Sequence, residues 1–142
     1  MPKFSTLSKE RLATCHSDLQ ILCNRLIERY DFTVVCGHRD EEAQNKAYRE
    51  GRSQKKWPDG MHNTLPSLAV DLSPFEHTGI DWGKLQSAFF AGYVLGCAEE
   101  LYAQGIMKHR IRGGVDWDMD NDVDDTKFWD AGHFEIRPNS HN

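Results

Sequence analysis

The stretch MHNTLPSLAVDL, residues 61–72, decides the fold because it joins a loop to a strand and carries two side chains that bind metals. His62 lies in the loop half, which contains a proline. The alternation from Ser67 to Leu72 predicts a half-buried strand, with the apolar side chains on one face and Asp71 on the other. A histidine and a carboxylate are thus expected at one end of a small sheet.

A second segment, WDAGHFEIR at residues 129–137, supplies a distant partner for this pair. We expect residues 133–137 to form the last strand, with His133 on the face away from the apolar side chains. Two ligands close together in the sequence and a third far along the chain are typical of catalytic zinc sites, where three protein donors leave one coordination position for water. Asp130 lies three residues before His133 and is the candidate general base that takes a proton from this water.

Other polar residues compete for roles in such a site. Arg39 follows an apolar segment and is the candidate cation that stabilises negative charge on a carbonyl oxygen. Glu135 is either a partner of a ligand imidazole or a surface charge. Three further histidines could act as ligands in rival arrangements, but their contexts are less convincing: His38, His77 and His109.

Periodicity predicts three helices and four strands. The first helix begins at Ser5 or Ser8 and carries an apolar stripe as far as Tyr30. A second follows Asp40 and ends at Gly51, and a third is expected over residues 82–104. The predicted strands are residues 32–36, 67–72, 107–112 and 133–137.

Length and composition predict one folded domain, residues 1–142. The formal net charge of −5 argues against nonspecific binding to nucleic acid. No apolar stretch approaches the about 20 residues that span a bilayer, and the N-terminus lacks the apolar region of a secretory signal. The four cysteines have no paired spacing, and we interpret all four as reduced core residues and not as disulfides or zinc ligands.

Acidic side chains alternate between residues 116 and 124 and could donate oxygen ligands to calcium. The twelfth position of this segment is Lys127, where an EF-hand needs glutamate, so a calcium site would be of another type. The alternative is a solvated acidic loop. The candidate calcium ligands are Asp116, Asp118, Asp120, Asp122 and Asp124.

The segments GHRDEEAQ, HNTLPSLAVDL and DAGHFEI together resemble the zinc peptidase family of D-alanyl-D-alanine dipeptidases and carboxypeptidases and phage L-alanyl-D-glutamate endopeptidases. The resemblance implies that His62, Asp71 and His133 bind zinc, that Asp130 is the general base and that Arg39 stabilises the transition state. Gln44 matches a glutamine position that follows the arginine. Gly60 replaces the family's serine, and the HN…PSLAVD form is similar to the phage endolysin branch.

The resemblance implies an α+β fold in which a small antiparallel sheet carries a zinc cleft and packs against about three helices. The implied substrate is the stem peptide of bacterial peptidoglycan, cut between L-Ala and D-Glu. Trp117 and Trp129 flank the acidic loop and are candidate cleft residues. We expect a monomer without membrane insertion, held in the cytoplasm until a holin-like partner opens the membrane to the periplasm.

Three alternatives stay open at this point. The first is a D-Ala-D-Ala carboxypeptidase or dipeptidase of the same family. The second is a metal-dependent nuclease, suggested by His62-Asn63 and the later His133. The third is a metal-binding module that has lost its chemistry, against which Asp130 and Arg39 argue, because a purely structural zinc site needs neither.

Overall fold

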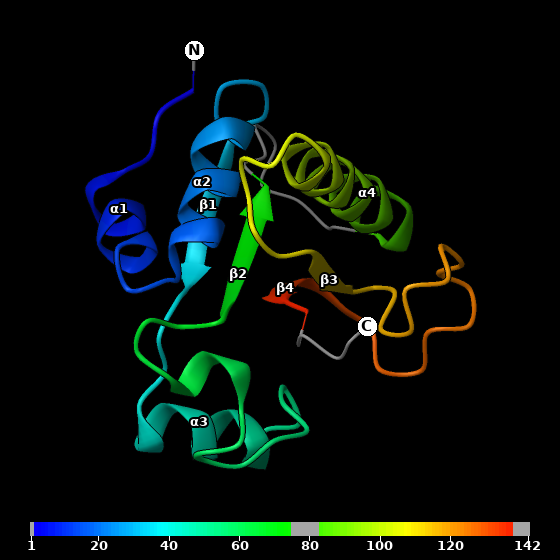
Figure 1. Cartoon of the computed structure of the whole chain (residues 1–142). Coiled ribbons are helices and arrows are strands. Elements are labelled where there is room, and N and C mark those ends of the chain that lie inside the picture. The colour runs from blue at the N-terminus through cyan, green and yellow to red at the C-terminus, as the bar shows by residue number, and fades with distance from the viewer. Residues whose placement is uncertain (1, 75–82, 138–142) are drawn as a thin grey trace.

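The computed structural model describes residues 2–74 and 83–137, and these form an α+β fold (Figure 1). Along the chain the elements are α1 (Thr6–Leu12), α2 (Ser17–Leu26), β1 (Phe32–Cys36), α3 (Glu41–Arg49), the short 3-10 helix η1 (Met61–Asn63), β2 (Ala69–Pro74), α4 (Lys84–Ala103), β3 (Ile111–Gly114) and β4 (Asp130–Ile136). The predicted fold class is confirmed.

The four strands form one antiparallel sheet in the order β1-β2-β4-β3. β2 and β4 lie at its centre, and the register sets Asp71 opposite His133. The two strand segments that were expected to carry metal ligands are therefore direct neighbours, although 62 positions separate their key residues.

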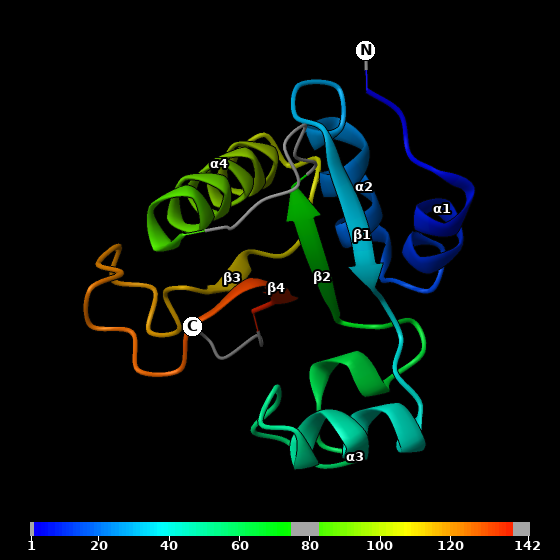
Figure 2. The same cartoon turned by 180° about the vertical axis from the view of Figure 1, so that it is seen from behind.

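The hydrophobic core lies between this sheet and the helices α2 and α4 (Figure 2). Val70 and Phe134 point from the central strands into the core and are fully buried, as are Leu19 on α2 and Val94 on α4. Burial of each such side chain contributes about 1.5–3 kcal/mol to folding. The opposite face of the central strands is left for Asp71 and His133, as the alternation of the sequence predicts.

The prediction of one continuous first helix was wrong, because the chain turns between Leu12 and Ser17 to form two helices. The backbone of this turn pairs with Ser67. The amide of Ser67 donates to the carbonyl of Thr14, and the amide of His16 donates to the carbonyl of Ser67, both at 2.8 Å. These hydrogen bonds replace helical ones, and a long-range pairing of this kind leaves no trace in the local periodicity.

Other boundaries moved by a few residues. β2 continues to Pro74 rather than stopping at Leu72, and β4 begins at Asp130 rather than His133. α3 begins as predicted, with the Asp40 side chain accepting a hydrogen bond from the amide of Ala43. The first residue expected in the third helix and the tail 139–142 lie outside the described residues.

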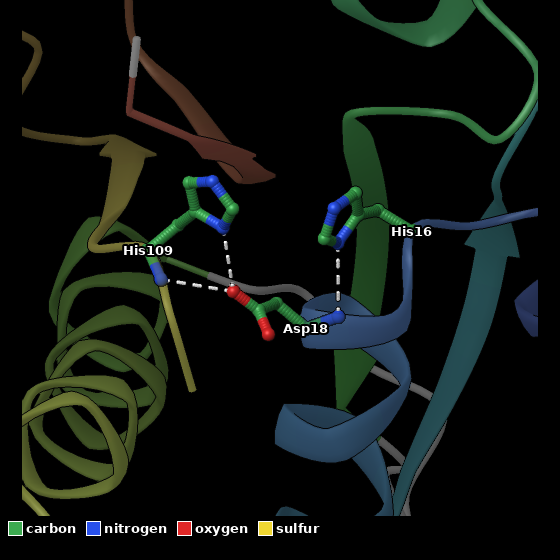
Figure 3. Close-up of side chains that lie close together, drawn as sticks. All are labelled: His16, Asp18 and His109. Atoms are coloured by element: carbon green, nitrogen blue, oxygen red, sulfur yellow. Dashed lines mark hydrogen bonds and ion pairs between the residues drawn. The ribbon is translucent and has the colours of Figure 1, made fainter. Parts of the chain in front are cut away.

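β3 begins at Ile111 and not at residue 107, because Asp18 binds the preceding backbone (Figure 3). The Asp18 carboxylate is buried and accepts hydrogen bonds from the amides of Lys108 and His109 at 3.0 and 2.9 Å. The same oxygen lies 2.8 Å from Nδ1 of His109. Asp18 thus ties the start of α2 to the segment that leads into β3.

His16 completes this cluster, since its Nδ1 accepts a hydrogen bond from the Asp18 amide and caps α2 (Figure 3). The rings of His16 and His109 pack edge to face, with centroids 5.3 Å apart. Two histidines and a carboxylate are a metal-binding combination, and one donor atom of each lies within 4.8 Å of the others. Their hydrogen bonds and ring contact nevertheless give the Asp18 carboxylate and both rings a structural role without an ion.

Replacement of Asp18 by alanine should destabilise the protein by about 1–3 kcal/mol, because the backbone amides of Lys108 and His109 would lose their buried acceptor. The midpoint of urea-induced unfolding measures this change. Asp31→Ala removes an exposed carboxylate and is the matched control, with an expected change within about 0.5 kcal/mol. Equal midpoints for the two variants would contradict the role given to Asp18.

Candidate metal and catalytic site

Asp71 lies at the centre of the candidate site. Its Oδ1 is 3.2 Å from Nε2 of His62 and 3.2 Å from Nδ1 of His133. The two imidazole rings stand edge to face with centroids 5.2 Å apart. The structure therefore brings together all three predicted metal ligands around one carboxylate oxygen.

His62 comes from η1 and is held by the backbone of the loop after β1. Its Nδ1 donates a hydrogen bond of 2.6 Å to the carbonyl of Gly37, which leaves Nε2 turned toward Asp71. A Cβ at Gly37 would collide with Thr14 and with the carbonyl of Arg11, so only glycine fits there. The end of α1 thus packs against the carbonyl that orients this imidazole.

His133 is oriented by Glu135, two residues further along β4. Nε2 of His133 lies 2.7 Å from Oε1 of Glu135, so Nδ1 faces Asp71. The other oxygen of Glu135 forms a 2.6 Å ion pair with Arg112 on β3. A carboxylate behind a ligand histidine fixes the ring and its tautomer. Of the two roles open to Glu135 from sequence, the structure places it as the partner of a candidate ligand.

Arg39 and Gln44 lie on the other side of Asp71. The Arg39 guanidinium donates to Oδ2 of Asp71 at 2.9 Å and to Oε1 of Gln44 at 3.3 Å. Gln44 is buried on α3, and its amide nitrogen donates to Ser53 and to the carbonyl of Lys55 at 3.0 and 2.7 Å. Gln44 therefore positions Arg39 and anchors the loop that carries Ser53 and Lys55 to α3.

Burial and ion pairing shift the pKa values of the two histidines and of Asp71. Burial opposes a charged His62, but hydrogen bonds to Asp71 and Cys36 outweigh it and raise the pKa of His62 to about 9. The pKa of His133 rises to about 8 in the same way, against its burial, through Asp71 and Glu135. Burial opposes ionisation of Asp71, yet the two histidines hold its pKa far below the usual carboxyl range.

Asp130 is the first residue of β4 and lines the cleft next to His133. Burial, followed by the negative charge of Asp71, raises the pKa of Asp130 above its ordinary value. A carboxylate with a raised pKa binds a proton more readily, as a general base must during catalysis.

The cleft in front of these residues has a volume of about 380 Å³. Trp117 forms part of its wall, with its ring centroid 5.4 Å from that of His133. Besides Arg39, three cationic side chains line the cleft, although the chain is acidic on average: Arg52, Lys55 and Arg112. Arg52 forms an ion pair with Glu50, and Arg112 forms one with Glu135. Arg112 was not expected among the site residues, because its position depends on strand pairing.

Trp129 does not line this cleft. It packs against the hydrophobic core, and the ammonium group of Lys84 lies 4.9 Å from the centre of its ring. The sequence could not separate Trp129 from Trp117, because both flank the acidic loop. Trp117 lies after the end of β3, and Trp129 directly precedes β4.

In the acidic loop, donor oxygens of Asp116, Asp118 and Asp120 lie within 4.8 Å of one another. Asp116 is buried, and its carboxylate accepts hydrogen bonds from the amides of Asp120 and Asn121. Asp122 accepts from the amide of Asp124, and neither of these two residues belongs to the close group. The five predicted calcium ligands therefore do not converge as one set.

Sequence reasoning also missed Cys36. It is half-buried at the end of β1 and not part of the core cluster, unlike Cys15 and Cys23. Its Sγ, a nitrogen of His62 and an oxygen of Asp71 all lie within 4.8 Å of one another. The apolar strand before it gave the signal of a core residue, and only the register of β1 shows where the thiol lies.

The chain shares its fold and its family with peptidases. The chain has the fold of the L-Ala D-Glu endopeptidase ChiX of Serratia marcescens, with a TM-score of 0.68 and 23% sequence identity over 95% of this chain and 90% of that one. The model of the phage L-alanyl-D-glutamate peptidase family matches residues 1–137, and the chain belongs to this family. No curated protein matches the chain. The resemblance noted in the sequence is thus confirmed.

In the two described ranges, 2–74 and 83–137, no helix combines the length and the apolar character needed to cross a bilayer.

Replacement of Asp71 by asparagine should lower the pKa of both site histidines in the metal-free protein. The variant loses the charge that stabilises the imidazolium forms, while burial continues to disfavour them, so the pKa of His62 should fall from about 9 to about 6.5 or below. NMR titration of the imidazole resonances measures both values. Asp31→Asn is the control, and unchanged titration in Asp71→Asn would refute the assigned coupling.

Proposed function

We propose that this protein is a zinc-dependent peptidoglycan endopeptidase of the endolysin type that hydrolyses the L-Ala–D-Glu bond of the stem peptide. One observation carries the proposal: His62 and His133, from distant parts of the chain, reach one oxygen of Asp71 at 3.2 Å, beside Asp130. The family of the chain is one of peptidases for this bond.

The donor set fits zinc. Two imidazole nitrogens and one carboxylate oxygen are among its preferred ligands, and three protein donors are usual where zinc is catalytic. Bound there, zinc would act as a Lewis acid that polarises the scissile carbonyl and lowers the pKa of water to about 7. The hydrogen bonds of His62 to Gly37 and of His133 to Glu135 hold the rings in the tautomers that such binding requires.

Asp130 and Arg39 have different roles in the proposed hydrolysis of the amide. Asp130 accepts the proton of the attacking water at its carboxylate and passes it to the amine that leaves. Arg39 lies within reach of the same space and stabilises the negative charge that develops on the carbonyl oxygen. Its hydrogen bonds to Asp71 and Gln44 hold the guanidinium in place beforehand.

The cleft rim supports a substrate with carboxylate groups. D-Glu in the stem peptide carries a carboxylate beside the scissile bond, and Arg52, Lys55 and Arg112 place cationic groups along the cleft. Trp117 offers a flat apolar wall to the peptide backbone and the alanine methyl group. Guanidinium groups bind carboxylates through paired hydrogen bonds, which favours this arrangement over a neutral substrate.

The phage family also supports a role in host-cell lysis. We propose that the protein stays in the cytoplasm of the infected cell until a holin-like partner gives it access to the periplasm. There it acts on the wall as a monomer, without nucleic acid as a partner.

Incubation of the zinc-loaded protein with purified sacculi should release fragments with new L-Ala carboxyl and D-Glu amino termini. Mass spectrometry of the released peptides identifies the bond. Cleavage between the two terminal D-Ala residues would instead favour a carboxypeptidase of the same family, and intact stems would refute the proposed function.

Asp130→Ala is the matched variant for this assay. It should keep one equivalent of zinc, because Asp130 is not a proposed ligand, and lose about 10²–10⁴-fold in turnover, because no other carboxylate takes the proton. Zinc content by atomic absorption separates loss of the base from loss of the metal. Full turnover in this variant would show that another group is the base.

We further propose that calcium binds the acidic loop through Asp116, Asp118 and Asp120, whose donor oxygens lie close together. Oxygen ligands at alternate positions are typical of calcium loops. The loop leads through Phe128 into Asp130, and Phe128 lines the cleft. An ordered loop would therefore support both the cleft wall and the base.

Added calcium should raise the turnover of the zinc-loaded protein, and Asp120→Asn should weaken this response, because the loop would lose a charged ligand. A calcium titration of the wall-lysis rate in metal-buffered solution measures both effects. Glu100→Gln removes an exposed carboxylate elsewhere and is the control. A turnover that stays constant across the titration would overturn the calcium proposal.

A further inference from the structure

Cys36 lies in the same cross-strand row as two candidate metal ligands. Its Cα pairs with that of Asp71 on β2, and the Cα of Asp71 pairs with that of His133 on β4. Residues paired directly across strands project from the same face of a sheet. The thiol, the carboxylate and the imidazole therefore emerge side by side on the face that carries the site.

An irregularity of β1 creates this alignment. Val34 pairs with Leu72, so a regular ladder would place Val35 opposite Asp71. The register instead shifts between Val34 and Cys36, which leaves Val35 46% exposed and sets the cysteine opposite Asp71. Bulges near active sites commonly redirect a side chain in this way.

The thiol is close enough to share an ion with its neighbours. Sγ of Cys36, a nitrogen of His62 and an oxygen of Asp71 lie within 4.8 Å of one another. Ligand bonds of about 2.0–2.3 Å place the donors of a tetrahedral zinc site about 3.3–3.8 Å apart, so these three donors must draw closer to share an ion. His133 lies outside this close group of three but has Nδ1 3.2 Å from Oδ1 of Asp71, and it must also turn toward Cys36. The thiol donates to the carbonyl of Gly37 at 3.5 Å, and thiols are weak hydrogen-bond donors.

We propose that Cys36 is a fourth protein ligand of the metal, which gives a set of two histidines, one aspartate and one cysteine. The inference rests on the proposed function, which places the metal at His62, Asp71 and His133. Thiolate is among the preferred ligands of zinc. Four protein donors fill the position that a catalytic site keeps for water, so this arrangement is a resting form that the thiol leaves before hydrolysis.

Cobalt substitution tests this assignment without reference to activity. Wild-type protein loaded with Co²⁺ should show a thiolate-to-cobalt charge-transfer band in the near ultraviolet, together with the weaker visible bands of the bound ion. Cys36→Ser should lose the charge-transfer band and keep the visible bands. Cys97→Ser removes another half-buried thiol, from α4 and outside the site, and should keep both.

X-ray absorption by the zinc-loaded wild-type protein gives a second measurement that needs no variant. One sulfur neighbour at about 2.3 Å from zinc is expected, with nitrogen or oxygen in the other positions. Bound metal without a sulfur neighbour or a charge-transfer band would overturn the role of Cys36 and leave the proposed function standing. Failure of the wild-type protein to bind either metal would overturn both.

Discussion

The carboxylate of Asp71 is the interaction on which the rest of the site depends. One of its oxygens faces both histidines, and the other accepts from Arg39, so a single side chain joins β2, β4, η1 and the loop after β1. Such a group is costly to bury unless it is fully paired, and here cations and hydrogen bonds surround it. In the metal-free protein the raised pKa values of the histidines stabilise the fold below pH 6.5. This contribution is lost as the pH rises through about 8 to 9.

In the metal-free protein, the protons on His62 and His133 compensate the charge of Asp71. A bound metal ion would compensate this charge instead. Binding requires neutral imidazoles, so zinc competes with the protons on His62 and His133. Glu135 and the carbonyl of Gly37 keep their hydrogen bonds to the outer ring nitrogens in either state. The rings therefore need little reorientation when protons are exchanged for metal, which is how outer partners prepare a binding site.

Sequence patterns predicted the parts of this protein that depend on local rules. Alternation in SLAVDL and HFEIR placed Asp71 and His133 on the polar face of the sheet, and the cap at Asp40 set the start of α3. The patterns failed where distant backbone groups compete. Ser67 interrupts the first helix through Thr14 and His16, and Asp18 delays β3 by binding the amides before it. Local periodicity carries no information about such partners.

The same distinction explains the site residues that sequence reasoning misplaced. Trp117 and Trp129 both flank the acidic loop in the sequence. In the folded chain Trp117 lines the cleft, whereas Trp129 packs against the core. Cys36 ends an apolar run, so its sequence context predicts a core residue. In the structure, a bulge in β1 turns it to the other face of the sheet. The cationic side chains of Arg52, Lys55 and Arg112 come from one loop and one strand that meet only in the folded chain.

The first helix has a bearing on how small such an enzyme can be made. The hydroxyl of Thr14, just after α1, accepts a hydrogen bond from the amide of His38. Gly37 has no room for a side chain, because the end of α1 and Thr14 fill that space. The Gly37 carbonyl in turn holds His62. Removal of the N-terminal helix to obtain a shorter lysin would therefore loosen the support of His62, the candidate metal ligand, although no residue of that helix lines the cleft. A fusion partner added ahead of an intact α1 would leave this support in place.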